Sequence, residues 1–363
     1  MPHADPELFE ALTREVAARR VNRRDDGEHA LFKYNTVQQL SREWTPVRRA
    51  ARGVIFHVPS ASVVCRPIPK FFNLDEADET RLENLPASAA LVEEKLDGSC
   101  VSLHLRDGEI RCATPGSFVS EQARWAQEEL ARRGLAADAG LRELLAGTTL
   151  VCEAIYPQNV SVVDYAERSE LVLLAAVDLG GDERRPAEVH ALAARFGLGR
   201  PRRFDLGVSR EMPVDPHAEG YVVSYWQGAR PLRVKVKGDE FLRLHPVVSA
   251  LNDRVVLELI ETGRVDEFAA RMPRAARERT DDIASALLRH FRALRSSVQA
   301  AHDAVKDLPT RKEQALALRR TADPAELPLV FRMLDGALTD AALWAVVRRS
   351  LRAERAVHDA EQE

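Results

Sequence analysis

The heptapeptide EEKLDGS, residues 93–99, lies between two stretches of strand-like sequence and contains the order K-x-D-G. A K-x-D-G tetrapeptide occurs by chance in about one chain of this length in ten, and it would then be a turn with a solvated lysine. The chemical alternative makes Lys95 a nucleophile toward the α-phosphate of a nucleotide, with Gly98 allowing a sharp turn beside it. Burial and nearby cations would have to lower the pKa of such a lysine.

The pentapeptide RVKVK, residues 233–237, is a second basic element. Alternation along a strand puts Lys235 and Lys237 on the same face. Two inward-pointing lysines are costly unless an anion meets them, so the alternatives are a clamp on nucleotide phosphates or a solvated edge strand. As a clamp, the pair would depress the pKa of Lys95 and stabilise charge that develops on phosphorus.

Two glutamates occur in strand-like context, Glu153 in LVCEAI (150–155) and Glu219 in AEGYVV (218–223). Each could be a structural carboxylate at a strand edge. Beside a phosphate site, however, the pair suggests one contact to a ribose and one to a magnesium ion.

A third cluster lies upstream of Lys95. It consists of Arg52-Gly53 and the stretch RPIPKFFN, residues 66–73, which includes Lys70 and Phe71. Basic and aromatic side chains together suggest a phosphate or nucleotide contact, and the alternative is an aromatic core pair with solvated charges. Phe71 fits the core better than a stacking role.

The elements that would position these residues are predicted from periodicity and turn signals. Helical spacing predicts helices over 6–20, 120–133, 186–196, 282–305 and 340–354. Short apolar runs predict strands over 54–58 and 63–66, and strand-like segments predict further strands over 91–95, 101–105, 148–155, 171–177, 221–226 and 232–237. The dipeptide Asp107-Gly108 predicts a hairpin turn, whereas the polar stretch Asn22–His29 is predicted as a loop.

Composition and texture indicate the domain organisation. A chain of 363 residues suggests two domains. Strand signals become scarce after residue 246, where Ala, Leu and Arg dominate, so we expect an α+β domain over 1–245 and an all-α domain over 246–363. The net charge of −4 neither indicates nor excludes nucleic-acid binding, since a basic cleft can lie on a neutral protein.

The sequence carries no sign of a membrane or secreted protein. No apolar run approaches the roughly 18 residues of a membrane helix, and the N-terminus has charges where a signal peptide is apolar. The four cysteines form no CxxC pair and fit buried free thiols in a reducing compartment, not a zinc site. We therefore expect a soluble, cytoplasmic protein.

Taken together, the order and spacing of these residues resemble the covalent nucleotidyltransferase superfamily of DNA ligases, RNA ligases and mRNA capping enzymes. KLDG at 95–98 resembles motif I, Glu153 stands at the place of the motif III acid, Glu219-Gly220 resembles motif IV, and KVK at 235–237 resembles motif V. Within that group the sequence is most similar to the phage-type RNA ligase 1 family, because ARGVIF (51–56) and RPIPKFFNL (66–74) resemble its upstream segments. The resemblance covers roughly residues 30–245.

This resemblance implies a nucleotidyltransferase domain built on antiparallel sheets with flanking helices. It also implies an ATP-dependent RNA ligase that uses Mg²⁺ or Mn²⁺, forms lysyl-AMP and joins 5′-phosphate to 3′-hydroxyl RNA ends. RNA repair, with broken tRNA as substrate and separate end-healing enzymes as partners, is the expected setting. The helical C-terminal domain matches that family's arrangement better than an OB-fold, and we expect it to contribute RNA-substrate specificity.

The resemblance also implies a role for each candidate residue. Lys95 is the nucleophile, and Asp97 and Gly98 shape its loop, with Asp97 near the metal. Glu153 binds the ribose and Glu219 holds the metal and the lysine. Lys235 and Lys237 are expected to grip the nucleotide phosphates. Arg52 is expected to hold AMP or an RNA phosphate, and Lys70 the pyrophosphate side of ATP.

One position departs from the family pattern. A basic residue usually precedes the Gly-Ser after the motif I hairpin, whereas this chain has Pro115 before Gly116-Ser117. Three alternative functions remain at this stage: an ATP-dependent DNA ligase, a sealing domain like that of fungal tRNA ligases, and a non-catalytic RNA-binding relative.

Overall fold

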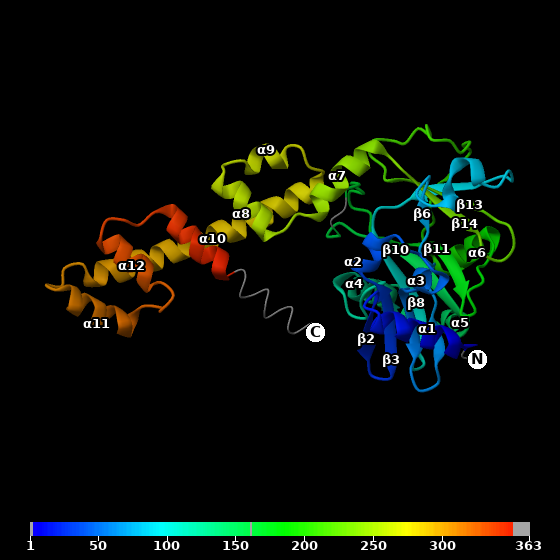
Figure 1. Ribbon diagram of the computed structural model, residues 1–363, viewed down its shortest axis with the longest axis horizontal. Helices are drawn as coiled ribbons and strands as arrows, with labels where there is room; N and C mark the ends of the chain where they lie inside the picture. Colours follow the sequence, from blue (N-terminus) through cyan, green and yellow to red (C-terminus); the bar gives the residue numbers. More distant parts are fainter. Residues whose placement is uncertain (1–2, 160–161, 351–363) are drawn as a thin grey trace. The chain divides into compact units, whose positions relative to one another are not determined.

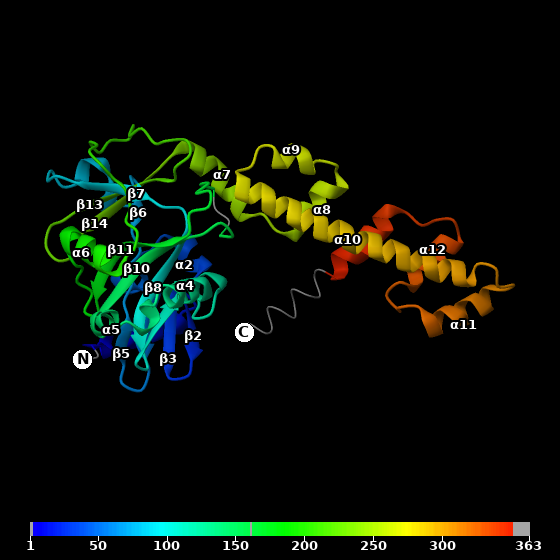
Figure 2. The same cartoon turned by 180° about the vertical axis from the view of Figure 1, so that it is seen from behind.

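The computed structural model describes residues 3–159 and 162–350, and the chain divides into two compact units, residues 1–245 and 246–363 (Figures 1 and 2). The division falls within helix α7 (Asp239–Ser249). The first unit holds three sheets with helices around them, and the described part of the second contains helices but no strand. The predicted α+β class with a helical C-terminal region is confirmed.

The first sheet is antiparallel and has the order β1-β5-β4-β3-β2. Its strands are β1 (His3–Ala4), β2 (Val21–Asp26), β3 (His29–Tyr34), β4 (Arg52–His57) and β5 (Ser62–Cys65). Helices α1 (Pro6–Ala17), α2 (Thr36–Ser41) and α3 (Pro46–Ala50) accompany it, and Leu12 of α1 packs in its core. The predicted loop over Asn22–His29 is wrong, because β2 pairs with β3 there. Only Val21 of this edge strand is buried, so β2 lacks apolar alternation.

The second sheet has the order β11-β10-β8-β9 and is antiparallel throughout. Its strands are β8 (Ser99–Arg106), β9 (Glu109–Ala113), β10 (Thr148–Ile155) and β11 (Glu170–Asp178). Helices α4 (Glu121–Arg132), α5 (Ala139–Leu145) and α6 (Pro186–Phe196) contact this sheet, and α6 lies beside β11 in Figure 2. The alternation of β10 places Leu150, Cys152 and Ala154 in the core that includes these helices. Its other face carries Val151 and Glu153 toward the candidate site.

The third sheet has the order β12-β7-β13-β14-β6. Its strands are β6 (Phe72–Asn73), β7 (Leu91–Lys95), β12 (Arg203–Phe204), β13 (Gly220–Tyr225) and β14 (Leu232–Lys237). All its pairings are antiparallel except that of β6 with β14. Gly220 is the register partner of both Lys95 and Lys237, so the ends of β7 and β14 flank the start of β13.

The second unit is arranged around the long helix α10 (Arg274–Val305). Helices α8 (Asp253–Glu261), α9 (Val265–Ala269), α11 (Arg311–Thr321) and α12 (Leu327–Leu334) all contact α10, and residues 340–350 are also helical. Phe291 of α10 stacks on Trp344 with ring centroids 4.2 Å apart. The predicted helix over 282–305 begins earlier, at Arg274, and the end of the predicted helix 340–354 lies outside the described residues.

Short 3₁₀ turns occupy Asp78–Thr80, Leu82–Asn84 and Leu135–Ala137. Asp107 and Gly108 have φ values of 53° and 75° and form the predicted β8–β9 turn. None of the helices in the described part of the chain is long and apolar enough to cross a membrane.

Candidate active site

Lys95 ends strand β7, and its ammonium lies in an ion-paired triad with Glu219 and Lys237. The Lys95 Nζ is 2.7 Å from Glu219 Oε2, and the Lys237 Nζ is 2.9 Å from Glu219 Oε1. Glu219 is only 4% exposed. A single buried carboxylate therefore neutralises part of the charge of two lysines and fixes where their amines lie.

Gly220 explains how Glu219 reaches this position. Its φ is +139°, and a Cβ atom at this residue would lie 1.9 Å from the carbonyl oxygen of Val236. Only glycine fits where β13 approaches β14 this closely. The Glu-Gly dipeptide is thus a structural unit, in which the glycine allows the strand pairing that places the carboxylate between the two lysines.

The loop after Lys95 is fixed from two sides. The Gly98 N–H donates to Glu153 Oε1 at 3.1 Å, and a Cβ at Gly98 would lie 2.6 Å from the carbonyl oxygen of Ala154. Gly98 has no positive φ, so the close approach of β10, not a left-handed turn, requires glycine here. The sequence suggested that Gly98 allows a sharp turn. In the structure, glycine is needed there because β10 packs closely against it.

Asp97 points away from the pocket into the loop that precedes β11. Its Oδ2 accepts hydrogen bonds from the backbone N–H groups of Val162 and Val163, at 2.7 and 3.0 Å. The Asp97 N–H donates to the hydroxyl of Tyr165 at 2.8 Å. Burial, with the nearby charge of Glu219, raises the pKa of the Asp97 carboxyl. The geometry gives Asp97 a positioning role, because it ties the lysine loop to residues almost seventy positions later.

Strand β14 presents both of its lysines to one pocket, as the alternation predicts. Arg52, Lys95, Glu153, Lys235 and Lys237 all line this pocket. Lys235 makes no ion pair with any residue that the structure describes, and its Nζ lies 4.5 Å from the centroid of the Phe71 ring. Burial, followed by the charges of Arg52 and other lysines, lowers the pKa of Lys235 to about 7. The pocket thus holds more positive charge than its own carboxylates neutralise.

Glu153 faces this cluster from β10. Burial of its carboxyl raises the pKa to about 7, and the charge of Lys95 is the strongest opposing influence. Arg52 donates a hydrogen bond from Nη1 to the carbonyl oxygen of Ile68 at 3.2 Å. These two groups retain unused hydrogen-bonding capacity at the pocket wall, which suits a ligand that carries hydroxyl and phosphate groups.

Lys70 lies apart from the other predicted phosphate contacts. It does not line the Lys95 pocket but an adjoining cavity, which shares Ile68, Phe71 and Arg233 with it. Its Nζ lies over the rings of Trp44 and Phe72, at 5.0 and 4.8 Å, and 3.9 Å from a Glu76 oxygen. Lys70 is therefore at the border of the site and not at its centre.

Lys33 of β3 was not among the residues predicted from the sequence. Lys33 is the register partner of Arg52 across β3 and β4, and partners in an antiparallel ladder project from the same face. A Cβ at Gly116 would lie 3.1 Å from its Nζ, so this amine lies against the loop that follows Pro115. A cation is thus present where the chain departs from the family pattern, contributed by another strand. No local sequence signal links Lys33 to this loop.

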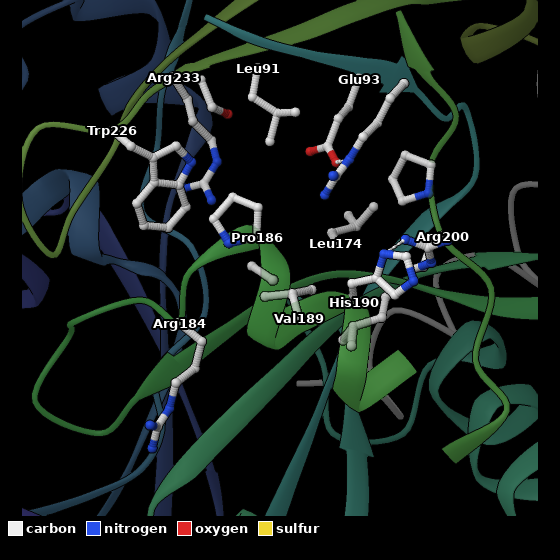
Figure 3. A pocket seen from close by; sticks show the side chains of 15 residues that line it. Leu91, Glu93, Leu174, Arg184, Pro186, Val189, His190, Arg200, Trp226 and Arg233 are labelled. Atoms are coloured by element: carbon white, nitrogen blue, oxygen red, sulfur yellow. Dashed lines mark hydrogen bonds and ion pairs between the residues drawn. The ribbon is translucent and has the colours of Figure 1, made fainter. Parts of the chain in front are cut away.

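The Lys95 pocket continues between the sheets toward the pocket drawn in Figure 3. The two share Glu93, Leu174, Pro201 and Arg233. In Figure 3, Glu93 and Arg233 extend toward the pocket from the third sheet, and Pro186, Val189 and His190 of α6 line the opposite side. The apolar wall of the Lys95 pocket includes Leu96, Val151, Leu174 and Val222. A cationic end and an apolar wall together match the phosphate and base ends of a nucleotide.

The acidic side chains of the site supply only some of the ligands that a divalent cation needs. No group of three or more His, Cys, Asp or Glu side chains suited to a metal occurs among residues 3–159 and 162–350. Glu219 offers a buried carboxylate, and magnesium is commonly bound by one or two carboxylates together with water and substrate phosphates. This donor set fits a metal that arrives with a phosphate ligand.

Comparisons with known proteins place the chain in a family. Residues 50–240, just over half of the 363 residues, match the family model described as RNA ligase. The chain belongs to this RNA ligase family, and the phage-type resemblance inferred from the motifs is confirmed.

Individual relatives extend the comparison. A Thermovibrio ammonificans protein named "Putative RNA ligase" is 29% identical over 253 residues, which cover 68% of this chain and 66% of that protein, slightly under two thirds of its length. RNA ligase 1 of bacteriophage TS2126 is 28% identical over 342 residues, or 86% of this chain and 80% of the phage protein. The solved structure of an archaeal ATP-dependent RNA ligase aligns with a TM-score of 0.46 at 16% identity, covering 76% of this chain and 75% of that one.

Proposed function

We propose that this protein is an ATP-dependent RNA ligase that joins 5′-phosphate and 3′-hydroxyl RNA ends through lysyl-AMP on Lys95. The observation that carries the proposal is the Lys95 amine, held 2.7 Å from Glu219 in a pocket that Arg52, Lys235 and Lys237 also line. Family membership supports the same reaction.

In the first step the lone pair of the Lys95 Nζ attacks the α-phosphorus of ATP. A P–N bond forms, the bond from the α-phosphorus to the bridging oxygen breaks, and pyrophosphate leaves with that electron pair. The ammonium must first lose a proton, and Glu219 Oε2 is the nearest acceptor. Since little other covalent chemistry falls to the protein, its contribution is position and charge.

The other residues position the nucleotide in this proposal. Lys235, Lys237 and Arg52 hold the phosphates, and Glu153 accepts a hydrogen bond from a ribose hydroxyl. The base lies against Leu174 and Val222. Glu219, with phosphate oxygens, would hold Mg²⁺ or Mn²⁺, which supplies neutralising charge for the phosphates when bound.

Steps two and three use the RNA. An oxygen of the RNA 5′-phosphate attacks the phosphorus of lysyl-AMP, the P–N bond breaks and Lys95 regains its amine. A 3′-hydroxyl then attacks the activated 5′-phosphorus, a phosphodiester bond forms and AMP leaves. In-line displacement requires the 5′-phosphate to enter opposite Lys95, on the side where pyrophosphate departed.

The proposal includes the setting of the reaction. RNA ends, with broken tRNA as the first substrate to try, are the proposed partners, and separate enzymes would prepare the ends. The helical second unit would contribute to substrate choice. Four free cysteines, three of them buried, fit a reducing compartment such as the cytoplasm.

The test is covalent labelling. Purified protein, checked beforehand by intact mass for bound AMP, is incubated with magnesium and α-labelled ATP and then denatured. We expect label on the polypeptide with the wild type and with Lys312→Ala, an exposed lysine of α11, and none with Lys95→Ala. Label that persists in Lys95→Ala would refute the assignment of the nucleophile. Parallel sealing assays with RNA and DNA ends then distinguish an RNA ligase from a DNA ligase.

A further inference from the structure

A second cavity adjoins the Lys95 pocket and takes part in none of the adenylylation chemistry described above. It has a volume of about 420 Å³, within the usual range of ligand sites. Its walls come from α1, α3, the segment 66–71 and the start of β14. Its basic residues are Arg49, Arg66, Lys70, Arg230 and Arg233, and its acidic residues are Asp5, Glu79 and Glu183.

The chemistry of this cavity matches a nucleotide. One side is apolar, with Leu8, Val47, Val54 and Ile68. The cavity carries five basic residues, and each has a carboxylate partner, with Glu76 near Lys70 and Asp182 paired with Arg230, so a phosphate would have to share these cations with their carboxylates.

Two of its guanidinium groups also have unused donors. Arg49 donates both Nη groups to Glu79, at 2.8 and 3.1 Å, and Arg66 donates Nη2 to Asp5 at 2.6 Å. The Nε atoms of both arginines are buried and have no hydrogen-bond partner among the residues that the structure describes. A buried donor without an acceptor is costly, and a phosphate or base oxygen would relieve that cost.

The position of the cavity relative to Lys95 indicates which nucleotide it would bind. Across the third sheet the order is β7 with Lys95, then β13, then β14 with Lys235 and Lys237, then β6. Lys70, which directly precedes Phe71 and β6, lines the cavity, and burial together with the charges of Arg52, Arg49 and Lys237 lowers its pKa. A row of cations therefore leads from the nucleophile across β14 into the cavity.

We propose that this cavity binds the 5′-phosphorylated terminal nucleotide of the RNA strand that receives AMP. The inference rests on the proposed function, because the second step needs a 5′-phosphate on the side of the α-phosphorus opposite Lys95. Lys70 and Arg49 then contact the RNA phosphate, and the terminal base lies against the apolar wall. This assigns Lys70 to the RNA and not to ATP.

The experiment isolates the second step. Enzyme carrying labelled lysyl-AMP is prepared first and then mixed with a 5′-phosphorylated RNA oligonucleotide whose 3′ end is blocked. AMP transfer is followed in single turnovers at increasing RNA concentration. For Arg49→Gln we expect the half-saturating RNA concentration to rise about tenfold, with the rate of lysyl-AMP formation from ATP changed less than about twofold.

Glu79→Gln is the matched control, because it breaks the same ion pair but keeps the cation. We expect it to leave RNA affinity unchanged or stronger, whereas a purely structural role of the pair would weaken both variants alike. Binding of a 5′-hydroxyl RNA to the adenylylated enzyme should not respond to Arg49→Gln.

Three results would overturn the proposal: unchanged RNA dependence in Arg49→Gln, an equal loss of lysyl-AMP formation, or an equal loss with 5′-hydroxyl RNA. Strong competition by a free nucleoside 5′-monophosphate against the RNA would instead assign the cavity to small nucleotides. Failure of the wild type to form lysyl-AMP at all would refute the proposed function, which is a separate outcome.

Discussion

Lys235 provides a quantitative test of the phosphate clamp through proton uptake. In the free protein, burial and the neighbouring cations hold its pKa at about 7. At pH 8 only about a tenth of the Lys235 side chains then carry a charge. A bound triphosphate favours the ammonium form and raises this pKa. If the bound side chain is fully protonated, binding at pH 8 takes up about 0.9 proton per site.

The sign of the pH dependence follows from the same linkage. Because binding raises the pKa of Lys235, its charge strengthens binding fully at pH values below its pKa in the free protein. This contribution to the affinity is lost as the pH rises toward its pKa in the complex. The affinity for α,β-methylene ATP, which resists attack at the α-phosphorus, should therefore fall by up to about tenfold per pH unit above pH 7.

Calorimetry measures the proton count directly. Binding of α,β-methylene ATP is titrated at pH 8 in buffers of different ionisation enthalpy, and the slope of the observed enthalpy gives the protons taken up. Lys235→Met should remove most of the uptake. Glu153, whose pKa is also raised to about 7, is the other candidate, and Glu153→Gln measures its share. No uptake in the wild type, or full uptake in Lys235→Met, would refute the argument.

Two further predictions follow from contacts in the site. In a urea titration, Gly220→Ala should lower the free energy of unfolding by at least about 3 kcal/mol, because its Cβ would lie 1.9 Å from a carbonyl oxygen. Gly228 also has a positive φ but open space around it, so Gly228→Ala should lower the free energy of unfolding by only about 1–2 kcal/mol. Lys33→Met should slow lysyl-AMP formation severalfold at subsaturating ATP, with stability changed by less than about 0.5 kcal/mol, whereas Lys312→Met changes neither. Equal costs for the two glycines, or an unaffected Lys33→Met, would contradict these readings of the contacts.

Local sequence was sufficient where an interaction involves near neighbours in the chain. The strand-like segment Leu91–Lys95 is strand β7, and the Asp107-Gly108 turn has the positive φ values that such a hairpin needs. Alternation along β14 placed Lys235 and Lys237 on one face, because side chains of a strand repeat every two residues. The α+β class and the RNA ligase family could be inferred from such patterns and are confirmed.

Tertiary structure decided what depends on register between distant strands. The carboxylate of Glu219 bridges Lys95 and Lys237 only because Gly220 is paired with both lysines. Lys33 reaches the Pro115 loop because β3 is the ladder partner of β4, and Lys70 lies in the adjoining cavity and not with the other cations. The edge strand β2 forms without an apolar pattern, because it is held by its hydrogen bonds to β3 and most of its side chains are not buried. Periodicity along a chain fixes which face a side chain occupies, but which faces meet is set by the pairing and packing of segments far apart in sequence.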